Sequence, residues 1–156
     1  MCIVMIVIKN EERTIKIDNK QLQSQAQRLL ELLDYADFDV GILLTNNTTM
    51  QQYNKTYRNQ DKPTDILSFP FHPDAQPSER IVTVGDDEKN LGDLIIAPAY
   101  VAQDAPNWGQ PFDQRMTILL IHGLCHLLGY DHIDDADYEI MKAKEEWLLG
   151  KLKEIA

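Results

Sequence analysis

The chain is poor in histidine, cysteine and positive charge. Of its 156 residues only 4 are histidine and 2 are cysteine, and 15 basic residues stand against 25 acidic ones, for a formal net charge of −10. Two cysteines exclude a disulfide framework and are typical of a reducing compartment. The acidic excess argues against a non-specific nucleic-acid binder, which is normally basic, although a metal and a local basic groove can offset the global field.

The sequence also lacks a long hydrophobic run. The apolar segment 2–8 is too short to span a bilayer, and no basic region precedes it as in a signal peptide. We therefore expect no membrane association and a cytoplasmic location, or an organelle if a transit segment was removed. With 44% hydrophobic and 26% charged residues, residues 1–156 are expected to form one globular domain.

Three of the four histidines fall in one short stretch, HGLCHLLGYDH, at positions 122–132. His122 and His126 are four residues apart, which on a helix places their Cβ atoms about 5–6 Å from each other. Gly129 can end that helix in the left-handed conformation, so that the chain returns and presents His132 to the same point. Three imidazoles with a fourth position left for water are typical of a catalytic zinc site.

The spacing is that of the metzincin motif H-E-x-x-H-x-x-G-x-x-H, with Gly123 in place of the glutamate that acts as general base. The pattern therefore predicts metal binding without peptidase activity. The metal is expected to be zinc, one ion per chain, with nickel or another divalent metal as alternatives. The competing interpretation is that these histidines are ordinary helix and turn residues. Cys125 lies about 100° from His126 and is expected in the core.

Two further residues of this region carry weaker predictions. Asp131 is expected to hydrogen-bond a ligand imidazole, to serve as a weak base, or simply to form the turn. His72, the one histidine outside the motif, is expected to be a surface or packing residue.

A second unusual stretch, NKTYRNQDKPTDILSF, spans positions 54–69. Arg58 is the side chain best suited to grip a phosphodiester, because its guanidinium is planar, always charged and bidentate. Lys55 and Lys62 make the surrounding segment locally basic, so an anionic substrate would be held here. The alternative is a surface arginine paired with Asp61.

Periodicity predicts strands at 3–8, 14–17, 38–45, 65–71 and 91–97. A helix is expected after an N-cap at Asp18, a second after Asn47 or Thr48, a short one from Pro98, and the motif helix after Asp113. The motif helix is apolar nearly all round and should lie in the centre of the fold. This order predicts an α+β domain with a small mixed sheet packed with helices.

Two helical faces are predicted in more detail. In the second helix Met50, Tyr53 and Tyr57 should point inward, for core packing rather than as an RNA-stacking platform. A last helix should run from an N-cap region at Asp134-Asp135 to about Lys153. Its inward residues are expected to be Ile140, Met141, Trp147, Leu148 and Leu152.

Taken together, the 54–69 stretch, the Leu91-Gly92-Asp93-Leu94 run and the histidine motif resemble the YbeY family of metal-dependent endoribonucleases. The resemblance covers about residues 38–147. It implies a zincin-like α+β fold and cleavage of single-stranded RNA, in small-subunit rRNA 3′-end processing and ribosome quality control. It also implies that His122, His126 and His132 are catalytic metal ligands and that Arg58 is the basic residue of the active-site cleft.

The implied chemistry is metal-assisted phosphodiester cleavage. With no base at Gly123, the nucleophile would be either metal-bound hydroxide or the 2′-OH of the RNA, with Arg58 stabilising the developing charge. The alternatives are a non-catalytic ribosome-associated zinc protein and a metalloprotease. Expected partners are single-stranded rRNA and the small ribosomal subunit or its proteins, since an acidic surface favours a positively charged partner.

Overall fold

The fold is organised around a four-stranded mixed sheet with the order β1-β2-β4-β3. In the computed structural model, which describes residues 5–154, β1 (Ile6–Asn10), β2 (Asp39–Leu44) and β4 (Asn90–Ile96) run parallel. The edge strand β3 (Ile66–Pro70) pairs antiparallel with β4. The predicted α+β fold with a small mixed sheet is confirmed.

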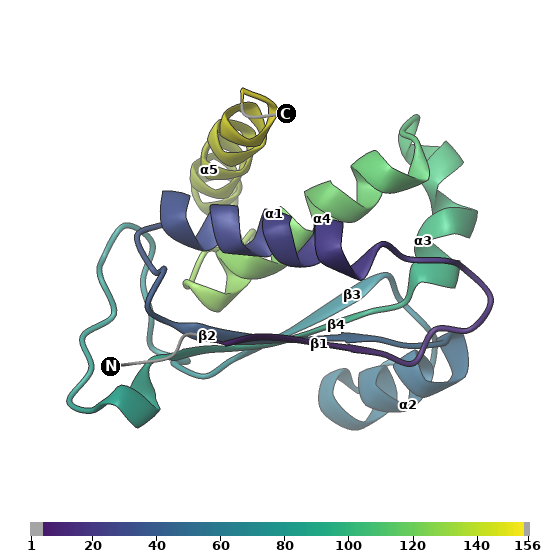
Figure 1. Cartoon of the computed structure of the whole chain (residues 1–156), viewed down its shortest axis with the longest axis horizontal. Helices are drawn as coiled ribbons and strands as arrows, with labels where there is room; N and C mark the ends of the chain where they lie inside the picture. The colour runs from purple at the N-terminus through teal and green to yellow at the C-terminus, as the bar shows by residue number, and fades with distance from the viewer. Residues whose placement is uncertain (1–4, 155–156) are drawn as a thin grey trace.

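Helices cover the two faces of the sheet unequally (Figure 1). The helices α1 (Asn19–Leu32), α4 (Phe112–Leu127) and α5 (Asp135–Lys153) lie on one side, and α2 (Asn47–Arg58) lies on the other. The short helix α3 (Pro98–Asp104) and the 3-10 turn η2 (Ala105–Trp108) lead from β4 to α4, and a second such turn, η1 (Asp86–Glu88), precedes β4. Within residues 5–154, none of the helices has the length and apolar character needed to cross a bilayer.

The helix α4 lies at the centre, as its all-round apolar sequence predicts. It contacts β3, β4, α1, α3 and α5, and nine of its residues are buried, Gly123 and Cys125 among them. Its N-cap is Pro111, whose extended backbone precedes the first helical residue, so the predicted cap at Asp113 is wrong and Asp113 lies in the first turn. The predicted caps of α1 and α5 are confirmed, since Asp18 accepts from Gln21 N and Asp134 from Asp137 N.

Other predicted strands and helix caps differ from those in the structure. The residues predicted as strand 14–17 form no strand, because the Glu12 carboxylate accepts hydrogen bonds from the backbone of Arg13, Thr14 and Ile15 and folds the segment into a turn. The α2 cap is Asn46, so the predicted caps at Asn47 or Thr48 are wrong by one or two residues. The predicted strand 3–8 appears as β1, and its first two residues lie outside the described range.

Three large side chains predicted to point inward are exposed instead. Tyr57 is 58% exposed, Ile140 51% and Trp147 44%. The helix α5 buries only the narrow stripe of Met141 and Leu148, two turns apart, because it contacts the rest of the fold along one edge, through α4 and α1. The apolar residues of α5 therefore cover a wider part of the helix surface than the part that is buried.

Candidate metal centre and its cleft

A cleft of about 970 Å³ opens along one side of α4. Its walls come from α4, the edge strand β3, the turn that follows α4, and the first half of α5. The side chains of Arg58, from the end of α2, and of Trp108, from η2, also line it. The cleft thus collects residues from both unusual stretches of the sequence.

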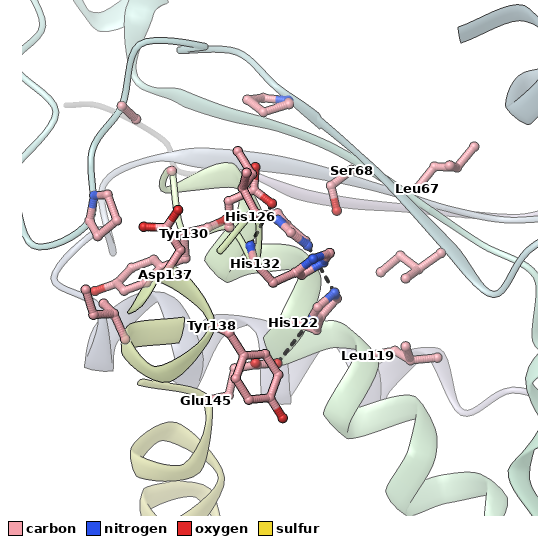
Figure 2. A pocket seen from close by; sticks show the side chains of 18 of the residues that line it. Leu67, Ser68, Leu119, His122, His126, Tyr130, His132, Asp137, Tyr138 and Glu145 are labelled. Carbon is pink, nitrogen blue, oxygen red and sulfur yellow. Dashed lines mark hydrogen bonds and ion pairs between the residues drawn. The ribbon is translucent and has the colours of Figure 1, made fainter. Parts of the chain in front are cut away.

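The three motif histidines converge in this cleft (Figure 2). One ring nitrogen from each of His122, His126 and His132 can be chosen so that the three atoms lie within 4.8 Å of one another. The Nε2 atoms of His122 and His126 are 3.0 Å apart, and the His132 ring centroid lies 5.2 Å from that of His126. The predicted convergence of the three rings is confirmed.

Contacts behind the rings orient two of the three imidazoles. His126 Nδ1 lies 2.9 Å from the carbonyl oxygen of Tyr130, which can only accept, so Nδ1 carries the proton. His122 Nδ1 lies 3.0 Å from Glu145 Oε2, and an ionised carboxylate likewise requires a donor. When both rings are neutral, as in the metal-binding form, both Nε2 atoms therefore present lone pairs to each other at 3.0 Å. Two lone pairs at that distance repel unless a cation lies between them, so the donor set fits a metal ion.

The pKa of His126 supports the same protonation state. Burial of the ring lowers this pKa below its usual value of 6.5, and the neighbouring His122 lowers it further, while the hydrogen bond to Tyr130 acts in the opposite direction. A neutral imidazole is the form that binds metal. His126 is therefore ready to act as a ligand at neutral pH.

Gly129 makes the turn that brings His132 back to α4. Its φ of +94° is in the left-handed region, and a Cβ at this position would lie 2.1 Å from the carbonyl oxygen of Ala75. Neither the backbone angle nor the space allows a side chain. The predicted helix end at Gly129 is confirmed. Glycine is required there both by the backbone angle and by close packing against the 73–77 segment.

Gly123 packs α4 against the sheet. A Cβ here would lie 2.8 Å from Ile66 Cδ1 and 2.8 Å from Leu94 Cδ2. A glutamate, as a metalloprotease carries at this place, would project into β3 and β4 instead of the cleft. Close packing of α4 on the sheet therefore explains why glycine stands where a metalloprotease has its glutamate. Without that base, a peptidase activity is not supported.

Arg58 reaches the cleft over the edge of the sheet. Its guanidinium donates to the Ser68 carbonyl at 2.7 Å, and its Cζ lies 5.0 Å from the centroid of the Phe69 ring. Asp61 instead contacts Lys55 at 3.9 Å and accepts from Gln51. The alternative of an Arg58–Asp61 surface pair is therefore wrong, and Arg58 lines the same cleft as the histidines.

Comparison with known proteins agrees with this geometry. The model of the family described as "Endoribonuclease YbeY" matches residues 7–153. The chain belongs to this family. It is 34% identical over 147 residues to the human protein named Endoribonuclease YbeY, covering 94% of this chain and 87% of that protein. To the protein of the same name from Syntrophotalea carbinolica it is 36% identical over 152 residues, covering 96% and 97%.

A solved structure shows the same fold. The solution structure of TM1509 from Thermotoga maritima superposes with a TM-score of 0.58 at 25% sequence identity, covering 96% of this chain and 93% of that one. The likeness therefore extends over nearly the whole of both chains.

Glu145 is one functional residue of this YbeY-family chain that the sequence did not reveal. It lies on α5, 23 residues beyond His122, and its carboxylate holds the His122 ring (Figure 2). Asp131, for which a contact with an imidazole was one of the predictions, accepts from the backbone N–H of His132 and lines the cleft. No spacing signal links His122 to Glu145, because they lie on different helices.

Arg115 and Asp65 were also missed as residues of the cleft. Arg115 is 8% exposed, its guanidinium lies 3.6 Å from Asp65 Oδ2, and both residues line the cleft. Arg115 precedes His122 by seven residues, which is two helical turns on the same face of α4. This spacing could have identified Arg115 as a cleft residue from the sequence.

The remaining predictions for this region are confirmed. His72 is a packing residue that contacts the Glu88 carbonyl at 2.7 Å, and it is not part of the histidine cluster. Cys125 is fully buried, and burial raises the pKa of its thiol to about 12. Cys125 is therefore an unreactive core residue rather than a fourth ligand.

Proposed function

We propose that this protein is a metal-dependent endoribonuclease that cleaves single-stranded RNA in the cleft beside α4. The observation that carries the proposal is the convergence of three imidazoles with the Arg58 guanidinium in one cleft. Membership of a family whose human and bacterial relatives bear the name Endoribonuclease supports it. The stretch that the family model matches, residues 7–153, includes the three histidines and Arg58.

His122, His126 and His132 would hold the metal, with zinc as our proposal. A metal ion held by imidazoles supplies Lewis acidity and a bound water of lowered pKa. Glu145 keeps the proton of His122 on Nδ1, and the Tyr130 carbonyl does the same for His126, so both Nε2 atoms stay available. These contacts orient the rings before any ligand arrives.

Arg58 would bind the phosphodiester that is cut. Its Nη2 donates to the Ser68 carbonyl, which fixes the guanidinium at the cleft edge and leaves other N–H groups free to face phosphate oxygens. Charge accumulates on those oxygens as one P–O bond forms and the other breaks, and a fixed cation stabilises it more in the transition state than in the ground state. We assign Arg58 this role.

The shape of the cleft supports a single-stranded substrate. A volume of about 970 Å³ is in the range of ligand pockets and suits a short unpaired segment rather than a duplex. The biological substrate that we propose is rRNA, with cleavage in 3′-end maturation of the small-subunit rRNA and in ribosome quality control. That assignment places the protein in the cytoplasm, in association with the small ribosomal subunit.

The test is cleavage of a labelled single-stranded rRNA fragment by the wild type and by Arg58→Ala, His126→Ala and Arg28→Ala. Arg28 is a matched control, because it is a surface arginine paired with Glu31 on α1 and lies outside the cleft. We expect Arg58→Ala to keep its metal and lose roughly 100- to 1,000-fold in rate, as for loss of one charge-stabilising donor. His126→Ala should lose both metal and activity, and Arg28→Ala should match the wild type.

Equal cleavage by all four proteins would identify a contaminant and contradict the proposal. Metal binding by a wild type that cleaves no single-stranded RNA would instead favour a non-catalytic metalloprotein. Metal content measured on the same samples separates these two outcomes.

A further inference from the structure

Trp108 is a large aromatic side chain left exposed inside the cleft. It is 54% exposed and lines the same cleft as the three histidines and Arg58. Exposed tryptophan is uncommon on a surface that binds nothing, because its burial contributes more than that of most side chains. The residue contributes little to the core, so its place in the cleft needs another explanation.

Two contacts fix the orientation of the indole. Its Nε1–H donates to Asp104 Oδ2 at 2.7 Å, and the Arg115 guanidinium carbon lies 3.9 Å from the ring centroid. Hydrogen bonds from Asn107 and then from Trp108 lower the pKa of Asp104, so this carboxylate is ionised and accepts at neutral pH. The ring is therefore held at its edge and on one face.

The cation on that face is itself held in place. Arg115 is 8% exposed and pairs with Asp65 at 3.6 Å. Among the residues that the structure describes, no other ring or cation stacks on Trp108. Trp108 is 54% exposed and carries a cation on one face, so the opposite face is the one available to a ligand.

The distance from the metal ligands suits a neighbouring nucleotide. Arg115 and His122 lie two turns apart on the same face of α4, which corresponds to about 10 Å along the helix axis. Trp108 stacks on Arg115, so the indole is set back from the metal ligands along α4, where a nucleotide next to the cleaved one could reach it.

We propose that Trp108 is a stacking platform for an unpaired nucleobase that flanks the scissile phosphate. A preoriented aromatic face binds any base through its π surface, and the base must leave its own helix to reach it. The platform therefore favours single-stranded over paired RNA without reading sequence. This inference rests on the proposed endoribonuclease function and names the part of the cleft that selects the substrate.

The chain contains a matched control in its only other tryptophan. Trp147 is 44% exposed on α5 and has Lys144 Nζ 4.7 Å from its ring centroid, yet it does not line the cleft. Both tryptophans are half-exposed with a cation on one face. They differ in whether the open face belongs to the cleft.

Fluorescence of single-tryptophan proteins tests the contact directly. The probe is a nuclease-resistant single strand, a 2′-O-methyl phosphorothioate oligonucleotide, added to Trp147→Phe, in which Trp108 is the sole reporter, and to Trp108→Phe, in which Trp147 is. We expect quenching of Trp108 and none of Trp147, because a stacked base quenches indole emission. Quenching that persists when the probe bases are replaced by abasic residues, or that appears only at Trp147, would overturn the proposal.

Kinetics with the cleavable rRNA fragment separate stacking from packing. Stacking of a base on an aromatic side chain corresponds to roughly 5- to 100-fold in binding, so Trp108→Leu should raise KM by that factor while kcat changes little. Trp108→Phe should restore most of the loss, and Trp147→Leu should match the wild type. Melting temperatures of all variants identify any that fail to fold.

The outcomes distinguish this inference from the function on which it rests. If the wild type cleaves and Trp108→Leu has an unchanged KM with a folded structure, the stacking platform is wrong and the nuclease proposal stands. If the wild type does not cleave at all, the proposed function fails first, and fluorescence quenching by the resistant single strand still tests the contact.

Discussion

The two sides of the histidine cluster are built differently. His122 and His126 are half-buried on the central helix, and each has its Nδ1 held by an acceptor of the protein. His132 is exposed on a turn, and within residues 5–154 no hydrogen bond holds its ring. The helix side is thus oriented by the fold, whereas the turn side is oriented only by the backbone around Gly129. Metal binding would therefore rely on the preoriented rings of His122 and His126, and it would fix the ring of His132.

The largest expected effect comes from removing either kind of ligand. We expect His126→Ala and His132→Ala each to weaken zinc binding by more than the roughly 100-fold that loss of an outer partner causes. Without metal they should differ, because His126→Ala also loses its contact with Tyr130 and about 1 kcal/mol of stability. His132→Ala should stay within about 0.5 kcal/mol of the wild type. Zinc titration and urea unfolding of metal-stripped proteins check both parts, and equal unfolding curves would remove the distinction.

The next effect concerns the carboxylate behind the helix side. We expect Glu145→Gln to weaken zinc binding roughly 10- to 100-fold, because the amide is a poorer partner for the His122 Nδ1 proton. Asp131→Asn is the matched control, since its carboxylate also lines the cleft but bonds only backbone. That variant should bind zinc within a few-fold of the wild type. A larger loss of zinc affinity in Asp131→Asn than in Glu145→Gln would show that Asp131, and not Glu145, supports the metal ligands.

A smaller effect tests the packing that holds the helix side in place. Gly123→Ala should cost about 1–2 kcal/mol of unfolding free energy net, because its Cβ meets Ile66 and Leu94 at 2.8 Å and the gain in helix propensity offsets only part of that overpacking. Gly150→Ala is the control on α5, where a Cβ meets nothing within 4 Å. It should stabilise the protein by roughly 0.5–1 kcal/mol through helix propensity. Denaturant unfolding measures both, and a neutral Gly123→Ala would show that α4 can move away from the sheet.

The smallest expected effect is the pH dependence of stability. The pKa of His126 is lower in the folded chain than its usual 6.5. As pH falls below 6.5 the unfolded chain takes up a proton that the folded chain does not, so stability is lost on acidification. The contribution is at most about 1.4 kcal/mol per pH unit. Urea unfolding of metal-stripped wild type between pH 7 and 5 should show a steeper loss than His126→Gln, and parallel curves would contradict the assignment.

Sequence reasoning succeeded where the determinants are local. His122, His126 and Gly129 lie within one helix and its end, so spacing alone predicts their convergence with His132. It failed for Glu145 and Trp108, because their contacts join elements that only tertiary packing brings together. The fold shows the same division. The central position of α4 follows from its composition, whereas the turn at 13–15 depends on one buried carboxylate at Glu12.

The most direct test of the account is the rate of single-strand cleavage as metal-stripped protein is loaded stepwise with zinc. Bound metal and cleavage are measured on the same samples. We expect the rate to rise in proportion to bound zinc and to level off at one ion per chain. A rate that does not depend on loading, or that continues to rise well beyond one ion per chain, would contradict a single metal held by His122, His126 and His132.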